Sequence, residues 1–108
     1  MTTLHVQLFS FGECPNRDAA MANVRAALDE ERVVADVTEV AVEDPTLAQE
    51  LRFLGSPSVR INGVDVEPAA RSVEEFGLMC RTYQAPHGLE GAPSIEMIRA
   101  AVRAQRKP

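Results

Sequence analysis

The hydrophobic period of this chain changes from two residues to about 3.6 within its first thirty residues, and this change limits the folds that it can adopt. In residues 4–11, apolar side chains recur at every second position, as at Leu4, Val6 and Leu8. This period is typical of a strand that is at least half buried. Apolar residues then recur at helical spacing: Ala20, Val24, Ala27 and Leu28. Because proline is favoured in the first turn of a helix, we expect this helix to begin at or beside Cys14 and to end near Glu31.

The rest of the pattern completes an α/β fold. We expect a strand at 33–42, a helix at 44–55, strands at 57–61 and 64–66, and a final helix at 94–105. The valine-rich second strand should run parallel to the first, because a helix connects the two. Asn62 and Gly63 accept positive φ angles and predict a two-residue hairpin. The expected order is β-α-β-α-β-β-α, with a central mixed sheet flanked by helices.

The stretch at about 67–93 is longer than a plain connection requires, and we expect an extended loop with a short helix there. Ser72 to Glu75 fits a capping box, and the prolines and glycines of 84–92 predict a loop. Long connections in compact domains are often functional, so this stretch is a candidate location for a site.

Length and charge restrict the class of protein. A chain of 108 residues suits a single domain spanning 1–108. The formal charge of −5 argues against nucleic-acid and membrane partners, since anionic partners require clustered Lys and Arg. We expect the basic cluster to be the solvated end of the last helix, where positive charge complements the helix dipole. The cluster consists of Arg99, Arg103, Arg106 and Lys107.

Targeting signals are not evident in the sequence. The N-terminus has no basic segment before an apolar stretch, and no apolar run approaches the ~20 residues of a membrane-spanning helix. We therefore expect a soluble, cytoplasmic protein. In a reducing compartment, Cys14 and Cys80 are expected to be reactive, metal-binding or buried rather than joined in a permanent disulfide.

Cys14 is the main candidate for chemistry because of its place between a strand and a helix. Unpaired backbone N–H groups and the positive end of the dipole at a helix N-terminus stabilise a thiolate over a thiol. Arg17 is expected to add to this effect, and Glu13 to oppose it. The alternative is that Cys14 is a small buried hydrophobic residue.

Two short motifs, each at the junction of two expected elements, carry a family resemblance. They are Cys14-Pro15-Asn16-Arg17, after the first strand, and Gly55-Ser56-Pro57, before the third. Together they resemble the thioredoxin superfamily, in which thioredoxin and glutaredoxin domains place a cysteine and a cis-proline in this order. The Cys14-Pro15-Asn16 turn, taken with the later run Cys80-Arg81-Thr82-Tyr83, is also similar to small bacterial thioredoxin-like proteins, some of them labelled as relatives of alkylmercury lyase.

The resemblance implies roles for the residues of both motifs. It implies a cis peptide bond before Pro57 and a Pro57 loop that faces Cys14, whereas an ordinary turn with a trans proline is the alternative. The backbone of Ser56 would pair with an extended substrate. Pro15 and Arg17 would lie at the same substrate-binding site.

The resolving cysteine of a Cys-x-x-Cys motif is absent from its usual place, because Arg17 stands there. A mixed disulfide on Cys14 needs a second thiol, supplied either by Cys80 or by an external thiol such as glutathione. Cys80 lies in a segment that combines apolar residues with Arg81 and Tyr83, which suits a buried edge or the wall of a site. The alternative is that Cys80 is packed in the core.

The leading hypothesis is a thiol-disulfide oxidoreductase without a cofactor, acting on a protein disulfide or a low-molecular-weight thiol through Cys14. A second hypothesis is a soft-metal or mercurial binding protein that uses Cys14 and Cys80, with His87 as a conceivable third ligand. A third is a redox-inert thioredoxin-like adaptor. All three require the same fold, so the sequence does not separate them.

Overall fold

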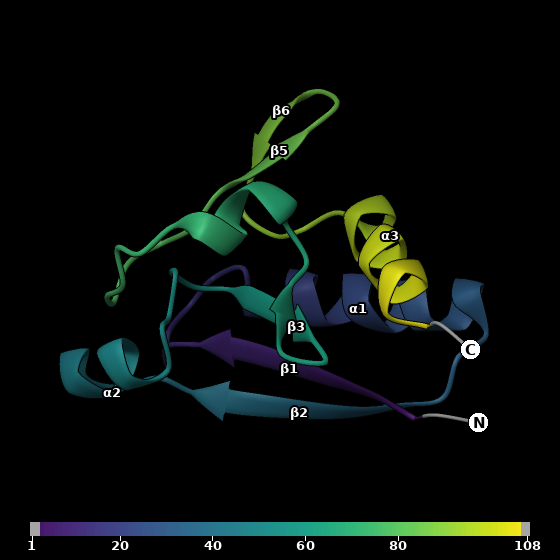
Figure 1. Cartoon of the computed structure of the whole chain (residues 1–108). Helices are drawn as coiled ribbons and strands as arrows, with labels where there is room; N and C mark the ends of the chain where they lie inside the picture. The colour runs from purple at the N-terminus through teal and green to yellow at the C-terminus, as the bar shows by residue number, and fades with distance from the viewer. Residues whose placement is uncertain (1–2, 107–108) are drawn as a thin grey trace.

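The computed structural model describes residues 3–106 and has a four-stranded mixed sheet, three α-helices and a small separate hairpin (Figure 1). The sheet strands are β1 (Leu4–Ser10), β2 (Ala35–Ala41), β3 (Ser58–Ile61) and β4 (Val64–Asp65). The helices are α1 (Arg17–Glu31), α2 (Pro45–Glu50) and α3 (Ile95–Gln105), with a 3₁₀ helix η1 at Pro68–Ser72. The hairpin pairs β5 (Tyr83–Ala85) with β6 (Gly88–Glu90). None of the described helices is long and apolar enough to cross a membrane.

The sheet has the strand order β2-β1-β3-β4. β1 and β2 are parallel, as expected for strands joined by a helix, and β3 is antiparallel to both β1 and β4. Asn62 and Gly63 have φ angles of 52° and 80°, which confirms the predicted two-residue hairpin. The α/β class and the mixed sheet are therefore as expected.

The two faces of the sheet are covered unequally because β1 alternates between them. Leu4, Val6 and Leu8 belong to the main core, which packs against α1 and α3. Phe9 points to the other face and packs in a smaller cluster with Phe53 and α2. In Figure 1, α2 lies at one end of the sheet, the end at which β1 finishes.

Glu31 ties α1 to α3. Its side chain is only 5% exposed and accepts from Arg99 and Arg103 at 2.8 Å each, while Arg106 lies 3.3 Å away. The hydrogen bonds from Arg103 and Arg99 lower the pKa of Glu31. The three arginines of the basic cluster are therefore ion-paired rather than simply solvated, and Lys107 lies outside the described residues.

Four local predictions differ from the structure. α2 ends at Glu50 instead of extending to residue 55. α1 begins at Arg17 rather than beside Cys14, because Cys14 takes part in a turn in which its carbonyl accepts from the Arg17 N–H at 3.3 Å. No helix follows Ser72, since the capping-box residues end η1 instead of starting a helix. The expected loop at 84–92 contains the β5–β6 hairpin.

Candidate functional site

Cys14 lies in a tight turn between β1 and α1 and is half-buried. Its N–H donates to the Phe11 carbonyl at 3.2 Å, so the turn is held to the end of β1. Asn16 is the N-cap residue, but its side chain makes no capping hydrogen bond. Instead it packs against Gly91, where an added Cβ would lie only 2.3 Å from Asn16 Nδ2. The Cys14 turn is therefore bounded by the loop that leads into α3.

Arg17 does not serve Cys14 as the sequence suggested. Its guanidinium is paired with Asp18 at 2.6 Å and with Glu39. The hydrogen bond to Glu39 raises the pKa of Arg17. Two carboxylates thus compensate the positive charge that was expected to support a thiolate, and α1 begins three residues after Cys14. Pro15 is exposed at the surface of the turn.

The Ser56–Pro57 peptide bond is cis, as the resemblance implied. The Phe11 N–H donates to Ser56 Oγ at 3.4 Å, which joins the Cys14 turn to the Pro57 loop. Figure 1 shows both loops at the same end of the sheet, after β1 and before β3. The two motifs singled out in the sequence are therefore neighbours.

The backbone of Ser56 is already paired within the chain. Its N–H donates to the Met79 carbonyl at 2.8 Å, and its carbonyl accepts from the Arg81 N–H at 3.0 Å. These bonds form a parallel bridge between Ser56 and Cys80. Since Ser56 is 1% exposed, the expectation that it presents free backbone to a substrate is wrong for this conformation. The segment of residues 76–81 occupies that position.

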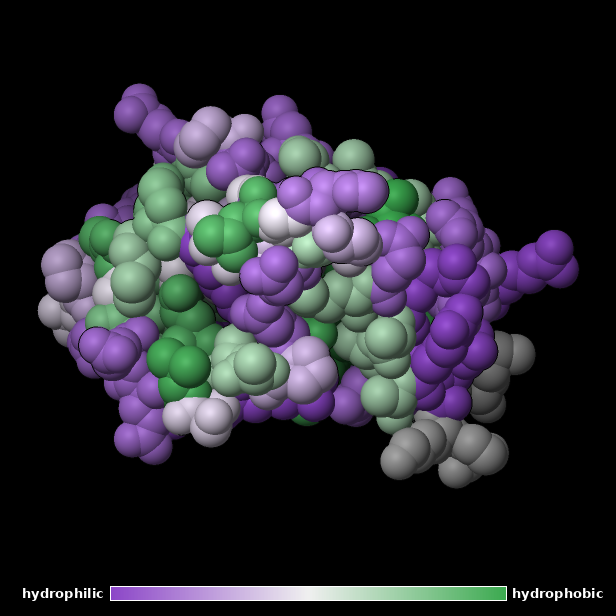
Figure 2. Space-filling model, turned by 90° about the horizontal axis from the view of Figure 1, so that it is seen from above, coloured by the Kyte–Doolittle hydropathy of each residue, from purple (hydrophilic) through white to green (hydrophobic). Residues whose placement is uncertain are grey.

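The 76–81 segment is held along the residues that precede Pro57. Gly77 N–H donates to the Phe53 carbonyl at 3.1 Å, and Gln49 donates to the Phe76 carbonyl at 2.6 Å. Its outer side is partly apolar, because Leu78 and Met79 are 39% and 40% exposed. Seen from above in Figure 2, the face that carries η1 and the hairpin has hydrophobic residues interspersed with hydrophilic ones.

The two thiols differ in exposure. Cys14 is half-buried and Cys80 is exposed, and both are free. The alternative that Cys80 is packed in the core is therefore wrong. His87 lies exposed in the β5–β6 turn, and within residues 3–106 no three metal-binding side chains lie together. The structure does not bring His87 to the cysteines as a third ligand.

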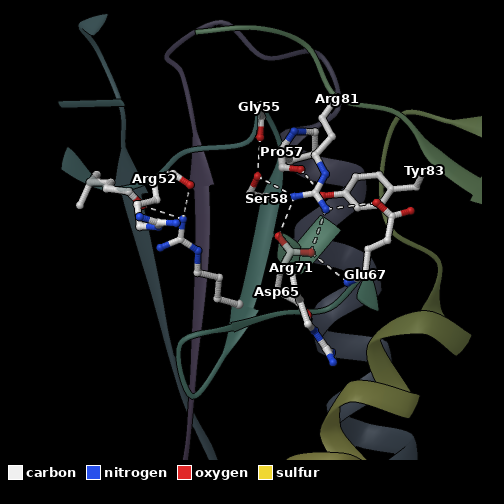
Figure 3. Close-up of polar contacts among 11 residues, drawn as sticks. Arg52, Gly55, Pro57, Ser58, Asp65, Glu67, Arg71, Arg81 and Tyr83 are labelled. Carbon is white, nitrogen blue, oxygen red and sulfur yellow. Dashed lines mark hydrogen bonds and ion pairs between the residues drawn. The ribbon is translucent and has the colours of Figure 1, made fainter. Parts of the chain in front are cut away.

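A buried polar network anchors the segment that carries Cys80 (Figure 3). Arg81 makes a bidentate pair with Asp65, with both N···O distances at 2.8 Å, and also contacts Glu67 at 3.3 Å. Arg81 further donates to Ser58 Oγ at 3.0 Å. Burial acts to lower the pKa of Arg81, but its hydrogen bonds and attraction to Asp65 more than offset this and raise it. Arg81 therefore stays charged inside the protein.

Tyr83 connects this network to the Pro57 loop. Its ring lies under the Arg81 guanidinium at 4.4 Å, and its hydroxyl donates to the Pro57 carbonyl at 2.5 Å. Burial raises the pKa of Tyr83, which keeps the phenol neutral. Sequence reasoning noted Arg81 and Tyr83 but not their partners. The signal was a charged residue two positions from an aromatic one in an otherwise apolar stretch.

Comparison with known proteins identifies no matching family model, no matching curated protein and no matching solved structure. The interpretation of the site therefore depends on its own geometry. That geometry consists of a half-buried cysteine near a helix N-terminus, an adjacent cis-proline loop and a second cysteine bridged to that loop.

Proposed function

We propose that this chain is a thioredoxin-like thiol-disulfide oxidoreductase in which Cys14 is the nucleophile. The observation that carries the proposal is the position of Ser56, which is bonded to the Cys14 turn through Phe11 and bridged to Cys80. Ser56 thus connects the turn that contains Cys14 to the segment that contains Cys80. The sheet order and the helix that follows Cys14 support the same fold family.

In the first step, the Cys14 thiolate attacks one sulfur of a substrate disulfide. A bond forms between Cys14 Sγ and that sulfur, the substrate S–S bond breaks, and the other sulfur leaves as a thiolate that takes a proton from water. Cys14 lies in the turn that leads into α1, three residues before the first residue of that helix, Arg17.

In the second step, another thiolate attacks Cys14 Sγ and releases the bound substrate half as a thiol. We propose Cys80 as this thiol, since it pairs with Ser56 at the place that the resemblance assigns to substrate backbone. The product is a Cys14–Cys80 disulfide, and two external low-molecular-weight thiols return the two electrons and restore both cysteines. Such thiols keep the cytoplasm reducing, and we propose that compartment as the setting.

A substrate that pairs with the Ser56 backbone must displace the 76–81 segment, which is bonded to it. Residues 71–75 and 78–80 are exposed, so the connection from η1 to Cys80 can shift without opening the main core. A low-molecular-weight disulfide needs the smallest displacement. A protein disulfide needs the segment to give up its bonds to Ser56 before an extended chain can pair there.

The test is a reaction of the reduced protein with glutathione disulfide, followed by alkylation and mass spectrometry. Wild type should end with an intramolecular Cys14–Cys80 disulfide. Cys80→Ser should stop at a glutathione adduct on Cys14, and Cys14→Ser should react far more slowly. The Cys14→Ser, Cys80→Ser double variant is the control for non-specific modification.

Other outcomes assign other functions. Equal reaction rates for wild type and Cys14→Ser would overturn Cys14 as the nucleophile. A glutathione adduct that persists on Cys14 in wild type would show that Cys80 does not attack Cys14 Sγ. An external thiol would then carry out the second step. A one-to-one Hg²⁺ complex that needs both cysteines, without reaction with the disulfide, would favour the soft-metal alternative. Cysteines that neither react with the disulfide nor bind metal would leave the redox-inert adaptor as the remaining hypothesis.

A further inference from the structure

Three arginines line one pocket of about 290 Å³ on the side of the sheet that carries α2. Arg52 comes from the turn after α2, Arg60 from β3 and Arg71 from η1. The remaining wall includes the apolar side chains of Leu54, Val73 and Phe76. This volume is at the small end of the range for ligand pockets, so it suits a molecule with a single ring.

The charges of these arginines are not compensated by nearby carboxylates. Across residues 3–106, no carboxylate oxygen lies within 4.0 Å of the guanidinium of Arg52, Arg60 or Arg71. The one acidic residue in the lining, Asp65, gives both its oxygens to Arg81 (Figure 3). The pocket is therefore positive although the chain carries a net charge of −5.

Neutral groups hold the arginines in place. Arg60 donates to the carbonyls of Leu51 and Arg52 at 2.7 and 2.9 Å, and Arg71 Nε donates to the Asp65 carbonyl at 2.9 Å. The Arg52 guanidinium lies over the Phe76 ring at 4.8 Å. A guanidinium has five N–H donors, and these contacts orient the side chains without neutralising them.

Arg60 shows the effect of this uncompensated charge. Burial lowers its pKa, and repulsion from Arg81 and Arg52 acts in the same direction, against the attraction of Asp65. A bound anion would relieve this repulsion. It would also accept hydrogen bonds from the guanidinium N–H groups that are not bonded to backbone carbonyls.

We propose that this pocket binds a small organic anion, with a carboxylate or phosphate on the arginines and one apolar ring against Leu54, Val73 and Phe76. Arginine suits this role because its planar group both pairs with carboxylate or phosphate and stacks on rings. The pocket does not include either cysteine, so the proposal stands independently of the thiol chemistry.

The test is a titration of the reduced full chain with phenyl phosphate, followed by two-dimensional NMR and calorimetry. Saturable shifts should appear at the amides of the pocket, notably Val64 and Val73. Arg52→Gln and Arg71→Gln should each weaken binding by about tenfold, the loss expected for one charge-assisted contact. Arg25→Gln is the matched control. Arg25 is exposed on α1, so this substitution removes the same charge from a place outside the pocket.

Two further probes separate the parts of the ligand. Inorganic phosphate and benzyl alcohol should both bind more weakly than phenyl phosphate, because each lacks one of the two groups. Absence of saturable shifts at millimolar phenyl phosphate would overturn the proposal, as would an equal loss of affinity in Arg25→Gln. The wild-type shift map decides the matter even where a variant fails to fold.

Discussion

Arg81 and Asp65 form a bidentate ion pair in which each side chain is only 6% exposed. Asp65 is the last residue of β4, and Arg81 follows Cys80 directly, so the pair joins the sheet to the segment that carries the exposed thiol. Because the Arg81 N–H also bonds to the Ser56 carbonyl, the ion pair fixes the bridge between Ser56 and Cys80.

The buried pair predicts a strongly non-additive pattern of stability. Arg81→Met alone should lower the free energy of unfolding by about 3–5 kcal/mol, because it leaves the Asp65 carboxylate buried without a counter-charge. Asp65→Asn alone should also be strongly destabilising, and the double variant should lose less than the sum. Urea unfolding at neutral pH measures all three.

The more exposed ion pairs of Arg17 provide the control for this set of Arg81 and Asp65 variants. Arg17→Met removes a guanidinium whose side chain is 38% exposed, and it should change the free energy of unfolding far less than Arg81→Met does. Additive losses from Arg81→Met and Asp65→Asn would show that the two residues act separately.

The parts of the fold that were predicted from the sequence depend on local patterns. The alternation of β1, the helical spacing of α1 and the Asn62-Gly63 turn involve neighbours in sequence, and the structure contains all three, although α1 begins later than expected. Ser94 likewise caps α3 by accepting from the Met97 N–H at 3.1 Å.

The rest depends on contacts between distant parts of the chain. Arg81 and Asp65 are 16 residues apart and lie on different elements, so neither sequence neighbourhood reveals the other. The capping box at Ser72 failed for a related reason: the backbone that a helix there would use is bonded instead to the residues before Pro57, as in the Gly77 to Phe53 bond. Long-range pairing overrode a local preference.

Gly91→Ala should disturb the Cys14 turn. An added Cβ would overlap the Asn16 side chain, with Nδ2 at 2.3 Å and Cγ at 2.5 Å, so that side chain must move into the space of the turn. We expect the rate of Cys14 glutathionylation to fall by roughly tenfold or more, because a small displacement of a reacting group has a large effect on rate. Mass spectrometry after timed quenching measures this rate.

Gly12→Ala is the matched control on the other side of the same turn. An added Cβ there meets nothing within 4 Å, so the Cys14 rate should stay at the wild-type value. If Gly91→Ala also kept the wild-type rate, the packing of Asn16 against Gly91 would not position Cys14.

Glu31 should make stability depend on acid pH. Its pKa is lowered in the folded protein by Arg103 and Arg99, so the unfolded state binds more protons between the folded pKa and the ordinary value of 4.5. This contribution is present above about pH 4.5 and is lost as pH falls through the folded pKa. Urea midpoints measured from pH 7 to pH 3 should fall more steeply in wild type than in Glu31→Gln. Parallel curves for the two proteins would contradict this role.

Gly55→Ala should loosen the 76–81 segment. Gly55 has φ +117°, and an added Cβ would lie 3.0 Å from Arg81 Cβ and 3.2 Å from the Met79 carbonyl oxygen. The backbone bonds of Ser56 to this segment should weaken, so the Ser56 and Arg81 amides should exchange with deuterium faster than in wild type. If the bridge also positions Cys80, the yield of the Cys14–Cys80 disulfide should fall in parallel.

Gly88→Ala separates backbone strain from this contact. Gly88 has φ +125°, so alanine is strained there to a similar degree, by about 1–3 kcal/mol, but its Cβ would meet nothing within 4 Å. In Gly88→Ala, the amides of Ser56 and Arg81 should exchange at the wild-type rate after correction for global stability. Faster exchange at those two amides in both variants would mean that general destabilisation, and not the close approach of Met79 and Arg81 to Gly55, controls the segment.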